Sequence, residues 1–269
     1  LTGSIIGNIL LVLGASILAG GLKFKTQTFN TTRASTGASM LLLAAMSFIV
    51  PTVYSYLLPD KATARRLDLS MDIAIVLIVI YTLSLLFELH THKQLFSARA
   101  EALPHDVGGH PLWMPGKAVG VLAGATVLVA WMSEILVGSV EHASQAMHLN
   151  ELFVGVIIIA VIGNAAEHST AILVAMKNQM DLSISIAVGS SLQIALFVAP
   201  VLVFAGRLFG KPIDLVFEPL EVIAVVLSVF VVNQVAHDGE CNWLEGVQLL
   251  SVYLILGIAF YFLPELVMH

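Results

Sequence analysis

The sequence predicts an all-α, polytopic membrane protein, and composition and segment length carry that prediction. Hydrophobic residues fill 58% of the 269 positions and charged residues only 11%, with a mean hydropathy of +0.94. A soluble domain carries about 25% charged residues, so the charges here are too few to cover a soluble surface. A net charge of −6 without a basic cluster excludes a nucleic-acid partner. The single cysteine, Cys241, excludes a disulfide framework and a Cys-based metal cage.

Eight apolar segments have the length of transmembrane helices, which need about 20 residues. Barrel strands would be about 10 residues long and alternate in polarity, whereas runs such as 73–86 are longer and uniformly apolar. In chain order the segments are 1–20, 38–58, 71–90, 117–140, 152–176, 182–206, 216–236 and 243–264. Lys and Arg divide 7 to 5 between alternate loops, which leaves the orientation in the membrane open.

The start of the chain and its longest polar stretch predict its organisation. The chain begins at Leu1 and enters an apolar stretch without a charged region or cleavage site, so this is not a signal peptide. We expect it to be a piece that begins at the edge of a membrane segment. The polar stretch 91–116 predicts a linker between a three-helix part, 1–90, and a five-helix part, 117–264.

An internal repeat relates the two parts. Shifting the chain by 186 residues places 3–22 on 189–208 with seven identities in 20 positions. Shared composition is the alternative, but Gly-Ser and Ala-Gly pairs recur at both ends of the alignment and favour a repeat. The fourth and fifth segments would then have their partners before Leu1. Five helices per half, an odd number, place the halves in opposite orientations, as in many secondary transporters.

The fifth segment contains Gly163-Asn164-Ala165-Ala166-Glu167-His168. Glu167 lies ~15 residues into the segment, or roughly 23 Å of helix, which is near mid-bilayer in a tilted helix. A buried carboxylate there costs several kcal/mol unless it is paired, protonated or bound to a cation. Gly163-Asn164 predicts a helix break that frees carbonyls. Asn164, Glu167 and His168 share a face, which favours a cation site over helix packing.

Polar residues also recur at repeat-related places. Ser190 and Gln193 are three apart in the sixth segment, and Ser4 and Asn8 are four apart in the first. Such residues usually join helices, but their repeat-related positions make a shared site an equal alternative. For the neighbouring Gly3 and Gly189, close helix packing is the simpler interpretation.

The fourth segment carries two further carboxylates. Glu134 and Glu141 are seven apart on one face, so they are candidates for a cation entry path. A hydrated helix end is the alternative for Glu141. The remaining acidic residues near segment ends are expected at the membrane interface: Asp72, Glu88, Glu218, Glu221 and Glu245.

The donor types predict the chemistry of the site. Carboxylate, amide, hydroxyl and carbonyl oxygens suit Ca²⁺, and no cysteine or histidine arrangement favours zinc or copper. Sodium or protons can use the same atoms. Desolvation favours a protonated carboxyl and a bound cation favours the ion, so the two compete, as antiport requires. An intramembrane hydrolase would need a nucleophile with its base or a His-Glu-x-x-His helix, and the sequence has neither.

These motifs resemble the cation/proton exchanger family of the calcium:cation antiporters. Residues 163–168 resemble its second signature motif, 3–14 and 20–30 resemble the helix after the first motif, and 131–137 resemble the helix that opens the second half. The resemblance implies inverted five-helix repeats of the calcium:cation antiporter type, with eight transmembrane helices in this chain. It implies a secondary transporter that exports Ca²⁺ in exchange for H⁺, not an enzyme, with a sodium-coupled or broader divalent-cation antiporter as alternative. It implies no cofactor, the lipid bilayer as surroundings and a bacterial-type plasma membrane, with a vacuolar membrane and a homo-oligomer left open.

The resemblance also assigns roles to residues. Glu167 would be the central calcium ligand, helped by the Asn164 side chain and the Gly163 carbonyl, with His168 tuning the site. The residues that would line the rest of the cavity are Ser190, Gln193, Ser4 and Asn8, and Glu134 would belong to the cation pathway. Two features depart from the family pattern. The first signature motif is absent, and the repeat offset places its glutamate about 20 residues before Leu1. Gly138 stands where many relatives have an acidic residue.

Overall fold

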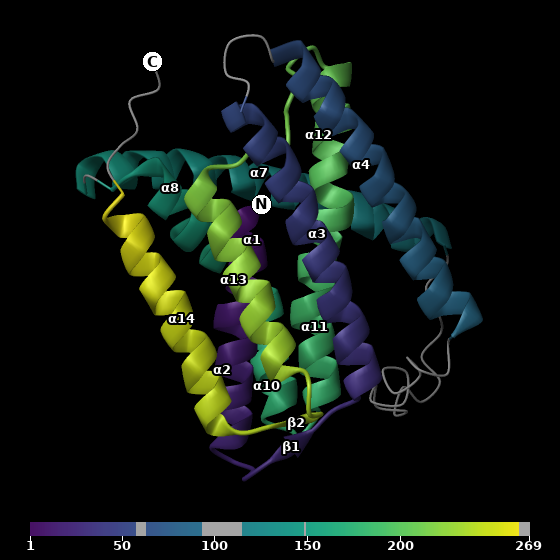
Figure 1. Ribbon diagram of the computed structural model, residues 1–269, viewed down its shortest axis with the longest axis vertical. Coiled ribbons are helices and arrows are strands. Elements are labelled where there is room, and N and C mark those ends of the chain that lie inside the picture. Colours follow the sequence, from purple (N-terminus) through teal and green to yellow (C-terminus); the bar gives the residue numbers. More distant parts are fainter. Residues whose placement is uncertain (58–62, 93–114, 148, 264–269) are drawn as a thin grey trace.

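Most helices of the protein run along one common axis, and α7 lies across them (Figure 1). The computed structural model describes residues 1–57, 63–92, 115–147 and 149–263. The predicted linker 91–116 therefore lies almost entirely outside the described residues, and the division into 1–90 and 117–264 stays a prediction.

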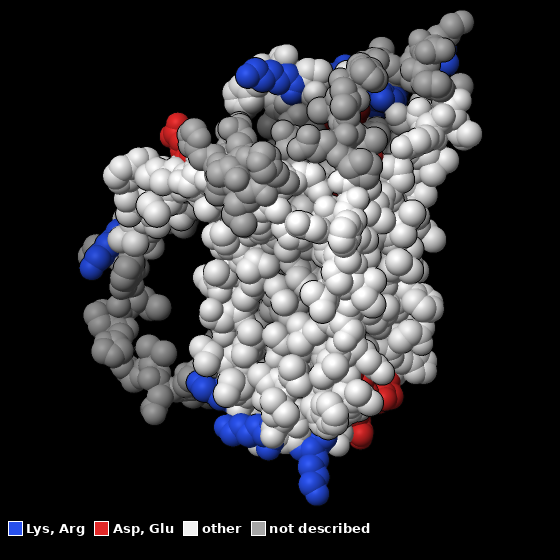
Figure 2. Space-filling view, turned by 90° about the vertical axis from the view of Figure 1, so that its left-hand side faces the viewer, with Lys and Arg blue, Asp and Glu red and all other residues white. Residues whose placement is uncertain are grey.

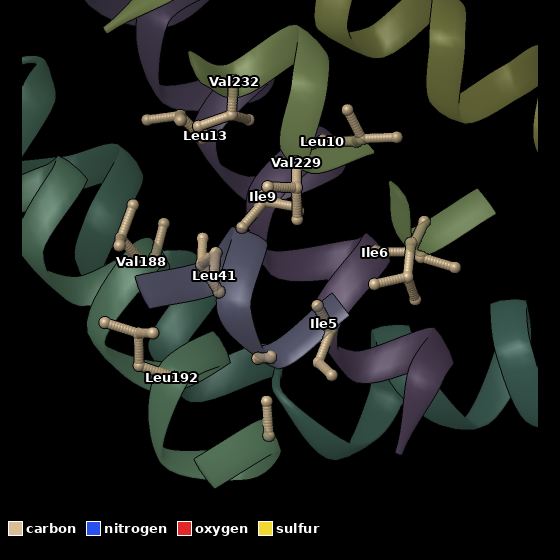
Figure 3. Close-up of a cluster of buried hydrophobic side chains, with 14 of the residues drawn as sticks. Ile5, Ile6, Ile9, Leu10, Leu13, Leu41, Val188, Leu192, Val229 and Val232 are labelled. Atoms are coloured by element: carbon tan, nitrogen blue, oxygen red, sulfur yellow. The ribbon is translucent and has the colours of Figure 1, made fainter. Parts of the chain in front are cut away.

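The first apolar segment forms the centre of the bundle. It is a continuous helical run of α1 (Thr2–Ile6), the π-helical η1 (Gly7–Val12) and α2 (Leu13–Gly21). Its side chains are buried because other helices surround the run (Figure 3). The labelled residues of this cluster are Ile5, Ile6, Ile9, Leu10 and Leu13 of the run, with Leu41, Val188, Leu192, Val229 and Val232 from neighbouring helices.

The surrounding elements follow in chain order. In the N-terminal part they are α3 (Thr31–Leu57), α4 (Thr63–Leu86) and η2 (Phe87–Thr91). Next come α7 (Pro115–Met147), α8 (Glu151–Phe153), η3 (Val154–Ile159), α9 (Ala160–Gly163) and α10 (Ala165–Ala175). The last are α11 (Met180–Gln193), η4 (Ile194–Val198), α12 (Ala199–Leu208), α13 (Pro219–Val235) and α14 (Trp243–Tyr261).

A two-stranded antiparallel sheet joins two loops at the lower end of the bundle (Figure 1). Strand β1 is Gln27–Thr28 and β2 is Glu240–Cys241, with Gln27 opposite Cys241. Burial raises the pKa of Cys241 to about 12, so its thiol stays protonated near neutral pH.

The eight predicted segments all coincide with helices. Among the described residues, six helices are long and apolar enough to cross, or seven if the bent pair Val154–Gly163 and Ala165–Ala175 is one span. The remaining segment corresponds to α13, whose 17 residues fall short of the usual span. The fold is thus an all-helical multi-pass membrane protein, and the count of eight stays a prediction.

The surface agrees with a membrane environment. On the face shown in Figure 2, the charged side chains of the bundle gather toward its two ends and the broad middle is uncharged. Large apolar side chains such as Met46 (57% exposed) and Val76 (57%) point outward from α3 and α4. In contact with lipid, exposing such apolar side chains carries no free-energy penalty, whereas in water it would.

The two helical runs aligned by the repeat share an unusual local feature. The 186-residue offset places residues 7–12, which form η1, on 193–198, which include η4 (194–198). Single π-helical turns are rare and occur frequently at functional sites. Their matching positions support the repeat and mark the level of the bundle at which a site is expected.

Close packing of α14 on α2 gives a first testable prediction. A Cβ on Gly246 would lie 2.4 Å from the backbone nitrogen of Leu18, whereas one on Gly257 of the same helix would meet only Ile157 Cδ1 at 3.7 Å. Gly246→Ala is therefore expected to lower the free energy of unfolding by about 1–3 kcal/mol, as overpacking does. The thermal midpoint of the purified protein should fall for Gly246→Ala and stay within error for the control Gly257→Ala. Equal midpoints for the two variants would contradict the close contact.

Candidate cation-binding site

The candidate site is built around a break in the helix of the fifth segment. The helix α9 ends at Gly163, Asn164 takes a non-helical conformation (φ −108°, ψ 13°), and the two helical pieces are bent by 63°. The break falls where Gly163-Asn164 predicts it. Glu167 follows in the first turn of α10, where the positive end of the helix dipole favours a carboxylate.

The side chain of Asn164 holds the break in place. Its Nδ2 donates to the carbonyl oxygen of Ala160 at 3.0 Å, one of the last carbonyls of the first helical piece. The same nitrogen donates to the Ser4 hydroxyl of α1. Because Nδ2 serves as donor to both, the amide oxygen is the atom left to face a cation.

A second chain of hydrogen bonds reaches Glu167 itself. Asn8 Nδ2 in η1 donates to Ser190 Oγ in α11 at 3.1 Å. Ser190 Oγ donates in turn to Glu167 Oε2 at 2.7 Å. Ser190 thus connects an amide of the first segment to a carboxylate of the fifth. We call Ser4, Asn8, Asn164, Glu167 and Ser190 the central network.

The central network is more open than the sequence predicts. Asn8 is 1% exposed and Ser4, Asn164 and Ser190 are half-buried, but Glu167 is exposed. The prediction of a buried carboxylate is wrong for this structure. The physical reason is the packing of α10, which buries Ala171 and Ala175 against α11 and α2 and leaves the face with Glu167 uncovered.

A cavity of about 340 Å³ adjoins the central network. Ser4, Gly163 and Asn164 line it together with apolar residues of η3 and η4. Gly163 is exposed, and a Cβ there would meet nothing within 4 Å, so its backbone borders open space. The predicted contribution of Gly163 through its carbonyl is compatible with this position and stays a prediction.

Other predicted residues take different places. Gln193 is exposed, and no hydrogen bond joins its side chain to another described residue. His168 is half-buried, and its Nε2 is enclosed without a hydrogen-bond partner in the described chain. Gly3 is a packing residue, because a Cβ there would lie 2.4 Å from Val156 Cα, whereas a Cβ on Gly189 would meet nothing within 4 Å.

Of the two glutamates of the fourth segment, Glu134 lies outside the central network. Glu134 is exposed on α7, the helix that lies across the bundle (Figure 1) and contacts chiefly η3. Glu141 belongs to the same helix, but its side chain lies outside the described residues. Their assignment to a cation pathway stays a prediction.

The structure also shows two acidic residues at helix starts, Glu221 and Asp181, that hydrogen-bond to distant segments and that the sequence does not predict as part of the site. Thr2, which lies two residues before Ser4, donates a hydrogen bond from its hydroxyl to Glu221 Oε1. Asp181 at the start of α11 accepts the backbone N–H of Asn30 at 2.7 Å. The spacing Glu218-x-x-Glu221 is a capping-box pattern that could have indicated a helix start, but no local pattern shows which distant residue shares its carboxylate.

The donor set of the region is oxygen-rich and has one carboxylate. The described residues contain no group of three or more His, Cys, Asp or Glu side chains able to hold a metal ion. A cation at the central network would therefore use Glu167 with amide, hydroxyl and backbone oxygens, which are ligands suited to a hard cation.

A broken helix with a carboxylate, joined by hydrogen bonds to a helix of a related half inside a membrane bundle, is the architecture of a secondary transporter. Residues 117–262 match the family model described as sodium/calcium exchanger protein. The chain belongs to this transporter family.

Individual relatives narrow the comparison. The chain is 46% identical to a Ca(2+)/H(+) antiporter of Aphanothece halophytica, covering 98% of this chain and 74% of that protein. It is 42% identical to the Ca(2+)/H(+) antiporter ChaA of Bacillus subtilis, covering 98% and 74%. It is 33% identical to vacuolar cation/proton exchanger 1 of Arabidopsis thaliana, covering 97% and 58%. The resemblance to cation/proton exchangers is confirmed.

A solved structure shows the same fold. The structure of native YfkE superposes with a TM-score of 0.80 at 39% identity, covering 97% of this chain and 73% of that chain. Another structure of that protein is described as a Ca2+/H+ antiporter. The calcium:cation antiporter type of fold is therefore confirmed for this chain.

Proposed function

We propose that this protein is a Ca²⁺/H⁺ antiporter that exchanges the two cations at Glu167 by alternating access. The observation that carries the proposal is the hydrogen-bond chain from Asn8 through Ser190 to Glu167. This chain links the one carboxylate of the network to two helical runs that the repeat relates. The names of relatives at 42–46% identity support calcium and protons as the exchanged ions.

The ligand set of the proposed site follows from atoms that remain available. Glu167 Oε2 accepts from Ser190, so Oε1 and the ionised carboxylate as a whole can face the cation. The amide oxygens of Asn164 and Asn8 and the Gly163 carbonyl would add neutral oxygens, with Ser4 and Gln193 on the rim. Calcium takes six to eight oxygens at about 2.3–2.6 Å, so water or further protein oxygens complete its shell.

Proton coupling follows from the position of Ser190. While Glu167 is ionised, the Ser190 hydroxyl donates to it, and Asn8 donates to Ser190. When Glu167 takes a proton it loses its attraction for calcium and becomes a donor itself. The site thus holds either a proton or a cation. His168, the next residue, would tune this exchange, and Glu134 and Glu141 would lie on the path to it.

Exchange of calcium for protons needs no resident cofactor and no chemical step. We therefore propose that the protein is not an enzyme and that calcium ions and protons are the only small species it binds. The relatives include bacterial and vacuolar antiporters, and we propose a bacterial-type plasma membrane for this chain. A second copy of the chain is left open as a partner.

The experiment that tests the proposal measures radioactive calcium uptake into everted membrane vesicles. An imposed proton gradient, acid inside, is expected to drive uptake, and collapse of that gradient by a protonophore is expected to abolish it. A sodium gradient of equal size in place of the proton gradient separates the sodium-coupled alternative. Competition by excess manganese or magnesium tests for a broader divalent-cation antiporter. Uptake driven by sodium but not by protons would overturn the proposal.

A further inference from the structure

Two hydrogen bonds at opposite ends of the bundle connect helices that carry residues of the central network to the start of another helix. We call α1 and α11 the site-bearing helices and these two hydrogen bonds the ties. At one end, Thr2 of α1 donates to Glu221 of α13. At the other end, Asp181 of α11 accepts from the Asn30 N–H, directly before α3. In Figure 1, α13 begins in the upper half of the molecule and α3 begins at the bottom.

Both contacts involve a residue that caps its own helix: Glu221 accepts through its carboxylate, whereas Asn30 donates its backbone N–H. Glu221 also accepts the backbone N–H of Glu218 at 3.1 Å and completes the capping box of α13. Asn30 also accepts the backbone N–H of Arg33 at 3.0 Å in the first turn of α3. In each place, the residue that caps its own helix also holds the end of a site-bearing helix.

The internal repeat relates the two pairs of helices that these hydrogen bonds join. The 186-residue offset places 2–21 on 188–207, within the run α11–η4–α12, and 31–57 on 217–243, which contains α13. The pair α1 with α13 is therefore the counterpart of the pair α11 with α3. Each pair joins a site-bearing helix of one half to the helix that follows the site-bearing helix in the other half.

Each tie lies close to residues of the central network along its helix. Thr2 is two residues before Ser4, and Asp181 is nine residues before Ser190, or about 3 Å and about 14 Å of helix rise. A helix moves as a rigid rod over such lengths. Holding its end therefore also sets the position of its network residue.

Two cavities lie along the α11–η4 run, and one of them adjoins the central network. The cavity of about 340 Å³ is lined by Ser4 and, on the α11–η4 run, by residues from Ile194 to Val198. A smaller cavity of about 80 Å³ lies between α3, η2 and α11 and is lined on α11 by residues from Asp181 to Leu192. Along this run the lining of the smaller cavity ends at Leu192 and that of the larger one begins at Ile194, so the two cavities follow one another along the helix that carries Ser190.

We propose that Thr2–Glu221 and Asn30–Asp181 are positioning pairs, one at each end, that limit how far the cavity on their own side opens. Loss of either hydrogen bond shifts the protein toward opening at that end. The inference rests on the proposed alternating access, and it assigns Glu221 and Asp181 an effect through helix position rather than contact with the cation. A hydrogen bond of ordinary strength corresponds to a population shift of about 3- to 10-fold.

The test uses cysteine reporters in the intact protein with Cys241→Ala as background. Val198→Cys reports the larger cavity and Val188→Cys the smaller one. The labelling rate by a water-soluble maleimide is measured in open membrane sheets, where both ends are accessible. Thr2→Val is expected to speed labelling at position 198 by about 3- to 10-fold without speeding it at position 188, and Asp181→Ala is expected to do the reverse.

Matched controls separate positioning from general loosening. Thr82→Val removes a hydroxyl that, within the described part of the chain, bonds only the Ile78 carbonyl of its own helix. Asp238→Asn alters an exposed loop carboxylate. Neither substitution should change labelling. Thr2→Ser keeps the hydroxyl and should restore the parent rate. Equal acceleration at both reporters, or at neither, would overturn the inference. Labelling needs no transport, so it can fail or succeed independently of calcium uptake.

Discussion

Glu167→Gln in the intact protein is expected to abolish proton-driven calcium uptake into everted vesicles, with a fall in initial rate of at least about 100-fold. Glutamine still accepts the hydrogen bond of Ser190, which is 2.7 Å from Glu167 Oε2. It can neither carry the negative charge that attracts calcium nor take up the competing proton. A 100-fold loss corresponds to about 2.7 kcal/mol, within the range for removing one partner of a charged interaction.

The control for this substitution is Glu240→Gln, which neutralises an exposed carboxylate in β2, far along the chain from the network. Its uptake rate should equal that of the parent. Because Glu167 is exposed, its replacement is also expected to leave the thermal midpoint unchanged, which shows that the loss is not one of folding. Uptake by Glu167→Gln at more than a tenth of the parent rate would remove Glu167 from the centre of the exchange.

Asn164→Ala is expected to lower calcium uptake by about 10- to 100-fold and the stability of the protein by about 1–3 kcal/mol. The substitution leaves the Ala160 carbonyl at the helix break and the Ser4 hydroxyl without the donor that serves both. Unsatisfied polar groups carry a penalty of that size. It also removes one neutral oxygen from the proposed calcium ligands. The initial rate is measured against calcium concentration, and the thermal midpoint on the purified protein.

The control for Asn164→Ala is the same substitution at an exposed asparagine. Asn233→Ala on α13 should change neither quantity. Asn164→Asp separates the two effects, because its oxygens can still bind calcium but an ionised carboxylate has no N–H for Ser4 and the Ala160 carbonyl. We expect it to lose stability while retaining more calcium affinity than Asn164→Ala. An unchanged uptake rate for Asn164→Ala would show that the helix break holds its shape without the side chain.

The helix break and the apolar segments could be predicted because each depends on residues that are close in sequence. A run such as 73–86 is helical in a membrane whatever surrounds it, since its backbone groups must be paired internally. Gly163-Asn164 interrupts a helix through local conformational preference and capping. For the same reason the sequence could predict Asn164 and Glu167 together as site residues, and both lie at the start of α10 in the structure.

The exposure of Glu167 and the paths to it could not be predicted in this way. Hydropathy indicates the depth of a residue along its helix but does not show which neighbouring helix covers its face. It therefore predicts a buried Glu167, whereas the structure shows Glu167 exposed. The position of Glu134 outside the central network likewise depends on tertiary structure, because α7 lies across the bundle (Figure 1). Gly3 and Gly189 look alike in the repeat, yet only Gly3 packs against a backbone.

The sequence by itself determined that this protein is a helical membrane protein with a broken helix carrying Asn164 and Glu167, because helix formation, breakage and membrane depth depend on composition over neighbouring residues. Only the tertiary structure decided that Asn8 and Ser190 bond toward Glu167 while Gln193 does not, and that Thr2 and Asn30 share the carboxylates of Glu221 and Asp181. These pairs join residues more than 150 positions apart, apart from Ser190 and Glu167. Such contacts depend on how whole helices rotate and cross, and no local pattern encodes that rotation.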